Sequence, residues 1–305
     1  MNIPNEQALK LVGRLLAKHV TAMPRMEISP FPSSEGQGDE EIAVLMVSDL
    51  QTGLKFTGFN SHVLRERVRK LAIGVEKVVS LHRRAYPVRR LAVFALGDMV
   101  HNDRIGRVIS LDELEKVVME QVFDVASPCL SELLVTLRQT FEMIDVYTVD
   151  GNHGSLGKYA AVKTNWDNVV YRTCELQLAQ YPEIRWHIEK KEFWQKVKLG
   201  KWVFLLTHGD SIPMHLTLPW YGITTRAMRW QGSLPGRDFQ YLCMGHFHTA
   251  SSLDWNEMEV FVNGAFVTSN GWVLKKLGLA SSTVQWFFGV HPRRGVTFRY
   301  KIRLK

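Results

Sequence analysis

The chain has 305 residues, of which 46% are apolar and 22% are charged, as is typical of a soluble globular protein. No apolar run is as long as a membrane span, and the first 25 residues are too charged for a signal peptide, so we expect a cytoplasmic protein that does not enter a membrane. The formal net charge of +8 favours an acidic partner such as nucleic acid, although a generally basic soluble surface explains it equally well.

Residues 6–20 place apolar side chains on one face of an expected amphipathic helix, and residues 30–39 are rich in turn formers. We therefore expect an N-terminal helix and linker over residues 1–40 and one domain over residues 41–305. The helix is expected to dock on its own domain rather than on a partner. The three cysteines, Cys129, Cys174 and Cys243, are widely spaced, which predicts buried free thiols rather than disulfides or zinc ligands.

Short apolar runs alternate with helical patterns in the first half of the domain, which predicts an α/β fold. Long helices are expected over residues 62–82 and 155–182. Another should open at a capping box formed by Ser110 and Glu113, and Ser127-Pro128 should restart it. The second half has shorter runs, and residues 284–290 and 296–304 predict an antiparallel hairpin with a basic outer face. We expect two packed sheets with helices outside.

Five apolar runs stop abruptly at polar residues, where ligands gather in open α/β sheets. The runs end at Ser48-Asp49-Leu50-Gln51, Gly97-Asp98-Met99-Val100-His101, Asp150-Gly151-Asn152-His153, Thr207-His208-Gly209-Asp210 and Gly245-His246-Phe247-His248. Side chains of these types in five places predict one metal centre. Asp98 follows a glycine that lets the backbone turn, so it is the expected carboxylate bridge between two ions. In extended chain, the spacing of Asp49 from Gln51 would put both side chains on one side, and likewise for His246 and His248.

These motifs, in this order over residues 41–265, resemble those of the calcineurin-like metallophosphoesterase superfamily. The resemblance implies a four-layer α/β/β/α sandwich around a dinuclear site. It implies the following protein ligands: Asp49, Gln51, Asp98 and His248 for one ion, and Asp98, Asn152, His208 and His246 for the other. It also implies that His153 protonates the leaving group or steadies the transition state, oriented by Asp150 or by a backbone carbonyl.

Within the superfamily, the segment from Gly97 to His101 is most similar to the SbcD-type repair nucleases, which makes His101 a second catalytic candidate beside a purely supporting role. Phage-encoded exonucleases are also similar around residues 151–166. The superfamily usually has histidine where this chain has Gln51. An amide oxygen suits Mn²⁺ or Mg²⁺ better than zinc, so we expect a weaker first site and Mn²⁺-driven activity. Gln51 could instead only hydrogen-bond a ligand.

The resemblance and the charge together predict a DNA nuclease that uses a hydroxide bridging two divalent ions. A phosphatase or small phosphodiesterase is the alternative, and a non-catalytic nucleic-acid-binding module with a decayed site is a third. The stretch over residues 211–237 is rich in aromatic residues and arginine. Arg226, Arg229 and Trp230 there could contact phosphates and stack bases, although core packing plus a solvated basic face is the favoured explanation for most residues of this stretch. The sequence leaves open a homo-oligomer, a partner ATPase, and endo- or exonuclease action.

Overall fold

The computed structural model describes residues 20–27, 38–103, 113–156, 164–189, 191–214, 219–233, 239–268 and 281–305. The expected N-terminal helix lies almost entirely outside these residues, as do most of the expected linker and Ser110 of the expected capping box. Residues 20–27 do lie on the domain: the Met23 amide donates to the Gln177 carbonyl at 2.8 Å, and the Tyr181 hydroxyl donates to the Pro24 carbonyl at 2.8 Å.

In the described chain, the first sheet has six strands in the order β11-β10-β1-β2-β3-β4. Their bounds are β1 Ile42–Val47, β2 Arg90–Ala95, β3 Met143–Thr148, β4 Ile184–Ile188, β10 Val284–His291 and β11 Gly295–Arg303. Strands β1 to β4 are parallel to their neighbours, and β10 pairs antiparallel with both β1 and β11. The predicted hairpin is therefore confirmed, and it extends the parallel sheet beyond β1.

The second sheet, again among the described residues, has five strands in the order β5-β6-β7-β9-β8. Their bounds are β5 Trp194–Leu199, β6 Trp202–Thr207, β7 Tyr241–Met244, β8 Ser251–Trp255 and β9 Met258–Val262. Strands β6, β7 and β9 are parallel, and β5 and β8 add antiparallel edges. Both sheets are thus mixed.

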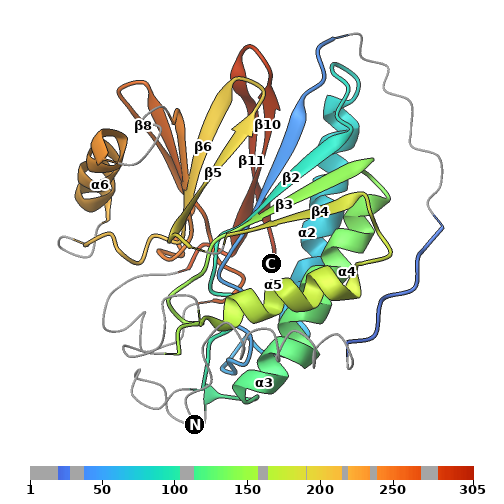
Figure 1. Ribbon diagram of the computed structural model, residues 1–305. Helices are drawn as coiled ribbons and strands as arrows, with labels where there is room; N and C mark the ends of the chain where they lie inside the picture. The colour runs from blue at the N-terminus through green and yellow to red at the C-terminus, as the bar shows by residue number, and fades with distance from the viewer. Residues whose placement is uncertain are drawn as a thin grey trace.

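Helices cover the outer face of each sheet (Figure 1). The helical segments are α2 Ser61–His82, α3 Val118–Glu120, the π-helical turn η2 Gln121–Ala126, α4 Ser127–Arg138, α5 Trp166–Gln177 and α6 Trp220–Ser233. Helices α2, α4 and α5 lie against the first sheet, and α6 lies against the second. The expected four-layer α/β/β/α arrangement is confirmed, and none of the helices in the described ranges has both the length and the apolar character to cross a bilayer.

Strand β1 shows why its sequence is a continuous apolar run. Its alternate side chains Ala43, Leu45 and Val47 belong to the core under the helices, whereas Val44 and Met46 belong to the core between the sheets. Because successive side chains of a strand point to opposite faces, a strand covered on both sides needs apolar residues throughout. Burial of these side chains stabilises the fold by about 25 cal/mol for each Å² of apolar surface removed from water.

Two predicted helices differ from the structure. Helix α5 begins only at Trp166, where the side chain of Asn165 caps it by accepting the amide of Asp167 at 2.8 Å. Helix α4 begins at Ser127 with Pro128 in its first turn, as predicted, but it continues from α3 and η2 without a break. Proline cannot donate to the carbonyl one turn earlier. The carbonyl of Asp124 is instead bonded by the Arg65 guanidinium at 2.5 Å, which satisfies it without ending the helix.

The basic outer face of the predicted hairpin is confirmed, because Thr297, Arg299, Lys301 and Arg303 on β11 are all exposed. Arg299 on β11 makes two hydrogen bonds of 2.7 Å to the carboxylate of Glu259 on β9, so it links the two sheets. Lys301 donates to the carbonyl of Ala250 at 2.7 Å. The three cysteines are buried and free, as predicted.

Candidate metal centre

The predicted ligands follow the ends of strands from both sheets: Asp49 and Gln51 after β1, Asp98 after β2, Asn152 after β3, His208 after β6, and His246 and His248 after β7. Parallel strands end at a common edge, so each sheet brings its polar loops together. The loops are also bonded to one another. The Asp49 amide donates to the Gly97 carbonyl at 3.1 Å, and the Gly245 amide donates to the His208 carbonyl at 3.0 Å.

Asp49, Gln51 and His248 form one half of the centre. The carboxylate of Asp49 is fully buried, and its Oδ1 accepts no hydrogen bond from the described residues. Instead it lies 3.1 Å from Nε2 of His248, which is 3.2 Å from the amide nitrogen of Gln51. A buried carboxylate oxygen without a donor is rare unless something else satisfies it. A cation held between Asp49 and His248 would do so.

Asp98, Asn152, His208 and His246 form the other half. One ligand atom each from Asp98, His208 and His246 lies within 4.8 Å of the others. Nε2 of His208 lies 3.2 Å from Oδ2 of Asp98 and 3.1 Å from Oδ1 of Asn152. Asp98 and His208 are each 1% exposed, whereas Asn152 and His246 are partly exposed.

The backbone of the predicted ligands is itself unusual. Seven non-glycine residues of the described chain have a positive φ, and five are predicted ligands: Asp49, Gln51, Asp98, His246 and His248, at 44° to 67°. A left-handed backbone costs of order 1–3 kcal/mol per such residue, and strain of this kind concentrates at functional sites. The pairs spaced by two residues do face one centre, but they lie in left-handed turns after the strands. The prediction that extended chain would align them is wrong.

Two glycines allow the loops to approach each other closely. Gly97 has a φ of +85°, and a Cβ there would lie 2.4 Å from the backbone nitrogen of Gly151. A Cβ on Gly151 would in turn lie 2.2 Å from Oδ1 of Asp98. No side chain larger than hydrogen fits at either position, which explains the glycine directly before Asp98 and the glycine directly before Asn152.

Hydrogen bonds orient the ring of His208 for binding a metal. Its Nδ1 lies 2.7 Å from the carbonyl of Leu96, which can only accept, so Nδ1 carries the hydrogen and Nε2 faces Asp98. Burial lowers the pKa of His208, but the charge and hydrogen bond of Asp98 outweigh burial and raise the pKa to about 10. Burial raises the pKa of Asp98, but His208 and His153 hold it well below its usual range.

His246 is held in the neutral form that a metal ligand requires. Burial and the neighbouring charge of His208 lower its pKa to about 4. Its backbone amide donates to Oδ2 of Asp49 at 3.2 Å, which connects the two halves of the centre.

His153 lies beside Asp98 with its ring orientation fixed. Its backbone amide donates to Oδ1 of Asp98 at 2.8 Å, and its Nδ1 lies 3.2 Å from the carbonyl of His101. That carbonyl can only accept, so Nδ1 carries the hydrogen and Nε2 is directed to the site, 3.8 Å from Oδ2 of Asp98. The carbonyl is thus the orienting group, because Asp150 bonds the Asn168 side chain at 2.5 Å. The His101 ring packs on His153 at 4.5 Å.

Asp167 is the residue of the centre that sequence reasoning missed. Its buried carboxylate accepts the backbone amides of Asp98 and Gly151 at 2.8 Å, of Met99 at 3.0 Å and of Val100 at 3.4 Å. It therefore ties the loop after β2 to the loop after β3, directly behind the predicted bridge. Burial and the charge of Asp98 raise its pKa to about 6. The available signal was an acidic residue in the first turn of a helix capped by Asn165.

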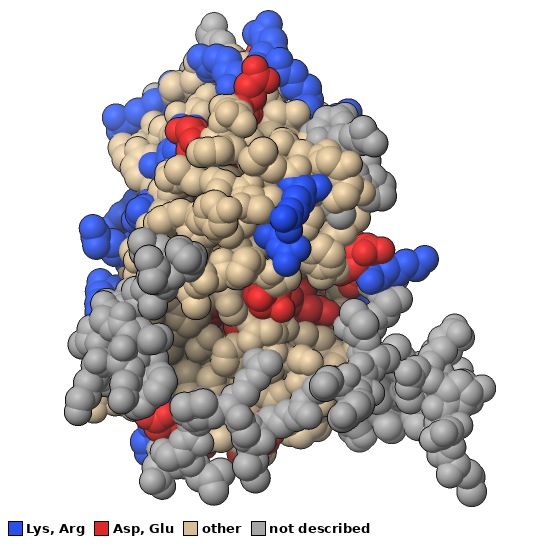
Figure 2. Space-filling model, turned by 90° about the vertical axis from the view of Figure 1, so that its left-hand side faces the viewer, with Lys and Arg blue, Asp and Glu red and all other residues tan. Residues whose placement is uncertain are grey.

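The predicted substrate residues are on α6, which lies against the outer face of the second sheet (Figure 1). Trp230 is only 6% exposed and packs in the core beneath that helix, so core packing, which the sequence favoured, accounts for it and it cannot stack a base. Arg226 is partly buried and Arg229 exposed. Figure 2 shows the face that carries α6, where Lys and Arg side chains lie in separate groups with uncharged surface between them. This view gives no continuous basic patch.

The donor set fits two hard or borderline divalent cations. It offers carboxylate, amide and imidazole groups and no thiolate, since all three cysteines are buried elsewhere. The unsatisfied Oδ1 of Asp49 and the carboxylate of Asp98, between His208 and His153, supply the negative charge. Only two carboxylates would face two divalent ions, so the centre would keep a positive charge toward a phosphate.

Comparison with known proteins adds fold neighbours of low similarity. No family model matches the chain, and neither does any curated protein sequence. Solved structures that match include an archaeal phosphodiesterase (12% identity, 85% of this chain, 99% of the other, TM-score 0.39). A hypothetical protein from Pyrococcus horikoshii OT3 also matches (11% identity, 86% of this chain, 88% of the other, TM-score 0.43). So does zinc-complexed Vps29 from Entamoeba histolytica (12% identity, 86% of this chain, 99% of the other, TM-score 0.37). At these TM-scores the matches carry no argument about this chain.

Proposed function

We propose that this protein is a metal-dependent phosphodiesterase that cleaves DNA. The observation that carries the proposal is the convergence of seven oxygen and nitrogen donors, five of them on left-handed backbone, around the buried carboxylates of Asp49 and Asp98. A strained and desolvated cluster of this composition has little structural use without an ion, because it leaves Oδ1 of the buried Asp49 carboxylate without a hydrogen-bond donor.

Each half of the centre would hold one ion. Asp49, Gln51 and His248 would bind the first, Asn152, His208 and His246 the second, and Asp98 would lie between them. Two such ions supply a nucleophilic hydroxide at neutral pH and neutralise charge on the phosphoryl oxygens. Because Gln51 offers an amide where an imidazole would favour zinc, we propose Mn²⁺ as the working metal.

The chain itself orients the groups and moves the proton. Asp167 fixes the backbone of Asp98, and the carbonyl of Leu96 fixes the ring of His208. His153, protonated on both ring nitrogens, would donate its Nε2 proton to the leaving oxygen, while its Nδ1 hydrogen stays bonded to the His101 carbonyl. His101 would support that ring by packing on it rather than by touching the substrate.

DNA is proposed as the substrate because of charge and of the motif after β2. A net charge of +8 attracts a polyanion, and the order of residues from Gly97 to His101 resembles that of repair nucleases. A phosphomonoester or a small cyclic diester would satisfy the same centre without the basic surface.

A cleavage assay with Mn²⁺ tests the proposal. End-labelled single- and double-stranded DNA are compared with bis-p-nitrophenyl phosphate and p-nitrophenyl phosphate, for the wild type and Asp98→Ala. We expect the wild type to degrade DNA and the variant, shown to be folded by circular dichroism, to have lost this activity. Hydrolysis of the small esters with intact DNA would instead assign a phosphatase or small phosphodiesterase. Equal DNA cleavage by the variant would contradict the proposal.

A further inference from the structure

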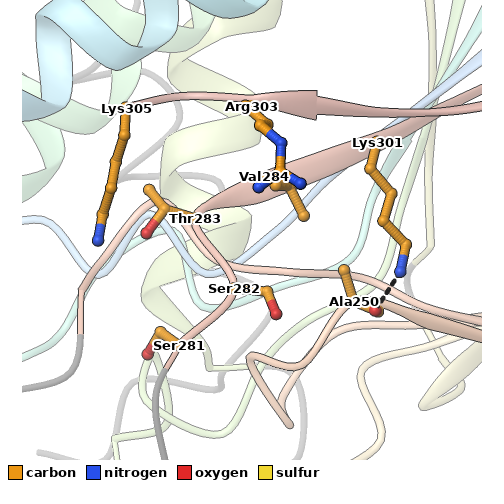
Figure 3. Close-up of a pocket in the computed structure, with 8 residues that line it drawn as sticks. All are labelled: Ala250, Ser281, Ser282, Thr283, Val284, Lys301, Arg303 and Lys305. Atoms are coloured by element: carbon orange, nitrogen blue, oxygen red, sulfur yellow. Dashed lines mark hydrogen bonds between the residues drawn. The ribbon is translucent and has the colours of Figure 1, made fainter.

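A pocket lies where the hairpin of β10 and β11 meets the loop after β7. It has a volume of about 340 Å³ and is lined by Ala250, Ser281, Ser282, Thr283, Val284, Lys301, Arg303 and Lys305 (Figure 3). We name it the basic pocket, because its lining contains three cationic and three hydroxyl side chains but no aspartate or glutamate. The volume is at the lower end of that of small-ligand sites, ~300–1,000 Å³.

The basic pocket adjoins the candidate metal centre. The amide of Ser282 donates to the carbonyl of His248 at 2.6 Å, and the hydroxyl of Ser281 lies 3.5 Å from Nδ1 of the same histidine. The sheet places it at the correct edge too. Because β10 runs antiparallel to β1, its first residue, Val284, lies toward the end of β1 that leads to Asp49, and Val284 is paired with Arg303.

The cations on β11, and Lys305 two residues after it, differ in the groups to which they are already bound. Arg299 donates from Nε and from one terminal nitrogen to Glu259, and Lys301 donates one hydrogen bond to Ala250 while its ammonium lies 4.9 Å from the centre of the Trp286 ring. Within the described chain, Arg303 and Lys305 form no ion pair with a carboxylate. Figure 3 shows their side chains extending from the strand to the segment that contains Thr283. Their charge is therefore available to a ligand.

Thr283 gives an independent sign of a missing partner. Its side chain lines the pocket and it is 6% exposed, yet its hydroxyl oxygen has no hydrogen-bond partner among the described residues. Leaving such a group unpaired costs about as much as desolvating it, so native proteins normally satisfy it. A buried hydroxyl beside two unpaired cations is the donor set that phosphate oxygens require.

We propose that the basic pocket binds a second phosphate of a nucleic-acid strand, next to the phosphate that is cleaved. The inference rests on the proposed function, because it treats His248 as part of the cleavage site. Phosphate binding in the basic pocket makes the enzyme select a strand with several phosphates over an ester that has only one. The second phosphate is held by groups that an ester with a single phosphate does not reach.

The test uses the Arg303→Gln/Lys305→Gln double variant, with Lys77→Gln/Arg84→Gln as a control. The control removes the same charge from exposed positions near the C-terminal end of α2, with Lys77 inside the helix and Arg84 just after it. With Mn²⁺, kcat/KM is measured on hexathymidylate and on the dinucleoside monophosphate TpT, which has one phosphate. We expect the ratio of the two values to fall roughly tenfold in the double variant, as expected for loss of charge-assisted phosphate contacts, and to stay within twofold in the control. Equal ratios in both variants would overturn the proposal.

Binding without turnover separates the pocket from the proposed function. Fluorescence anisotropy of labelled hexathymidylate is measured in EDTA at several salt concentrations. The slope of log Kd against log salt should fall by about 0.7 in the double variant, the value for one lost phosphate contact on a single strand. Thr283→Val should weaken binding without lowering Tm. If the wild type cleaves no diester but these variants bind less, the proposed function is wrong and the pocket stands. If the wild type cleaves DNA but the variants bind hexathymidylate as tightly as the wild type, the proposal for the basic pocket is wrong and the proposed function stands.

Discussion

The carboxylate of Asp167 lies directly behind the backbone of Asp98 and accepts its amide at 2.8 Å. The same group holds the amide of Gly151, so one buried side chain sets the spacing of two loops that carry predicted ligands. Precise ligand placement at the centre thus depends on a residue that would not itself touch a metal.

Replacing Asp167 with asparagine should loosen that arrangement. One oxygen and its charge are lost, and the new amide hydrogens would face backbone donors, so we expect roughly 1.5–3 kcal/mol of destabilisation. Affinity for Mn²⁺ should fall ~10–100-fold, as for other groups that orient ligands. Glu175→Gln on the same helix is the control, because its exposed pair with Arg172 should contribute under about 1 kcal/mol. Chemical denaturation and metal titration measure both effects, and unchanged metal affinity in Asp167→Asn would contradict the role.

Gln51→His should change which metal binds the first site. An imidazole would replace an amide next to His248, and histidine is among the residues that tolerate a left-handed backbone. We expect roughly tenfold tighter zinc binding, with a smaller gain for Mn²⁺. Competitive titration with a chelating dye measures both constants. Identical affinities in the two proteins would show that position 51 does not touch the ion.

His153→Gln should separate chemistry from metal binding. The loss of a proton donor lowers kcat by about 10²–10⁴, whereas the ligands named above are intact. Metal content by elemental analysis should equal that of the wild type. His62→Gln, at an exposed position on α2, should change neither quantity. Loss of metal together with activity would mean that His153 is a ligand.

Metal binding should release a proton from His208. The pKa of its ring is raised to about 10 in the metal-free protein, and only the neutral ring can be a ligand. Between about pH 6 and 9 the ion must displace that proton, so the apparent affinity should increase up to tenfold per pH unit. His246 should not contribute there, because its pKa is lowered to about 4.

Calorimetry in two buffers of different ionisation enthalpy counts the released proton. Burial raises the pKa of Asp150 to about 8, so Asp150→Asn is the control that removes its titration. About one proton should be released at pH 8 in that variant as well. Affinity that does not vary with pH would contradict the assignment of His208.

The strand ends and the helices over the first sheet could be predicted because each follows from local rules. Apolar runs of strand length, interrupted by Gly-Asp or Gly-Asn, identify buried parallel strands and the edge where they end. The backbone that aligns Asp49 with Gln51 could not be predicted, because a left-handed turn is stabilised by contacts distant in sequence, such as the amide of His246 on Asp49.

Asp167 and Trp230 show a different limit. Asp167 lies 16 residues beyond Gly151, and nothing in that spacing indicates that its carboxylate turns back to four amides. Trp230 lies in a stretch of aromatic residues and arginines, so its sequence context allowed a base-stacking surface beside the favoured core position. Only the packing of α6 on the second sheet decides for the core.

Electron paramagnetic resonance of the protein loaded with two equivalents of Mn²⁺ tests most directly whether Asp98 joins two ions. The account predicts the broad spectrum of an exchange-coupled pair, because ions sharing one carboxylate lie about 3.5–4 Å apart. Asp98→Asn should abolish the coupling, and Asp254→Asn, at an exposed position on β8, should keep it. A six-line spectrum of isolated Mn²⁺ in the wild type, or the same coupled spectrum in Asp98→Asn, would contradict the account.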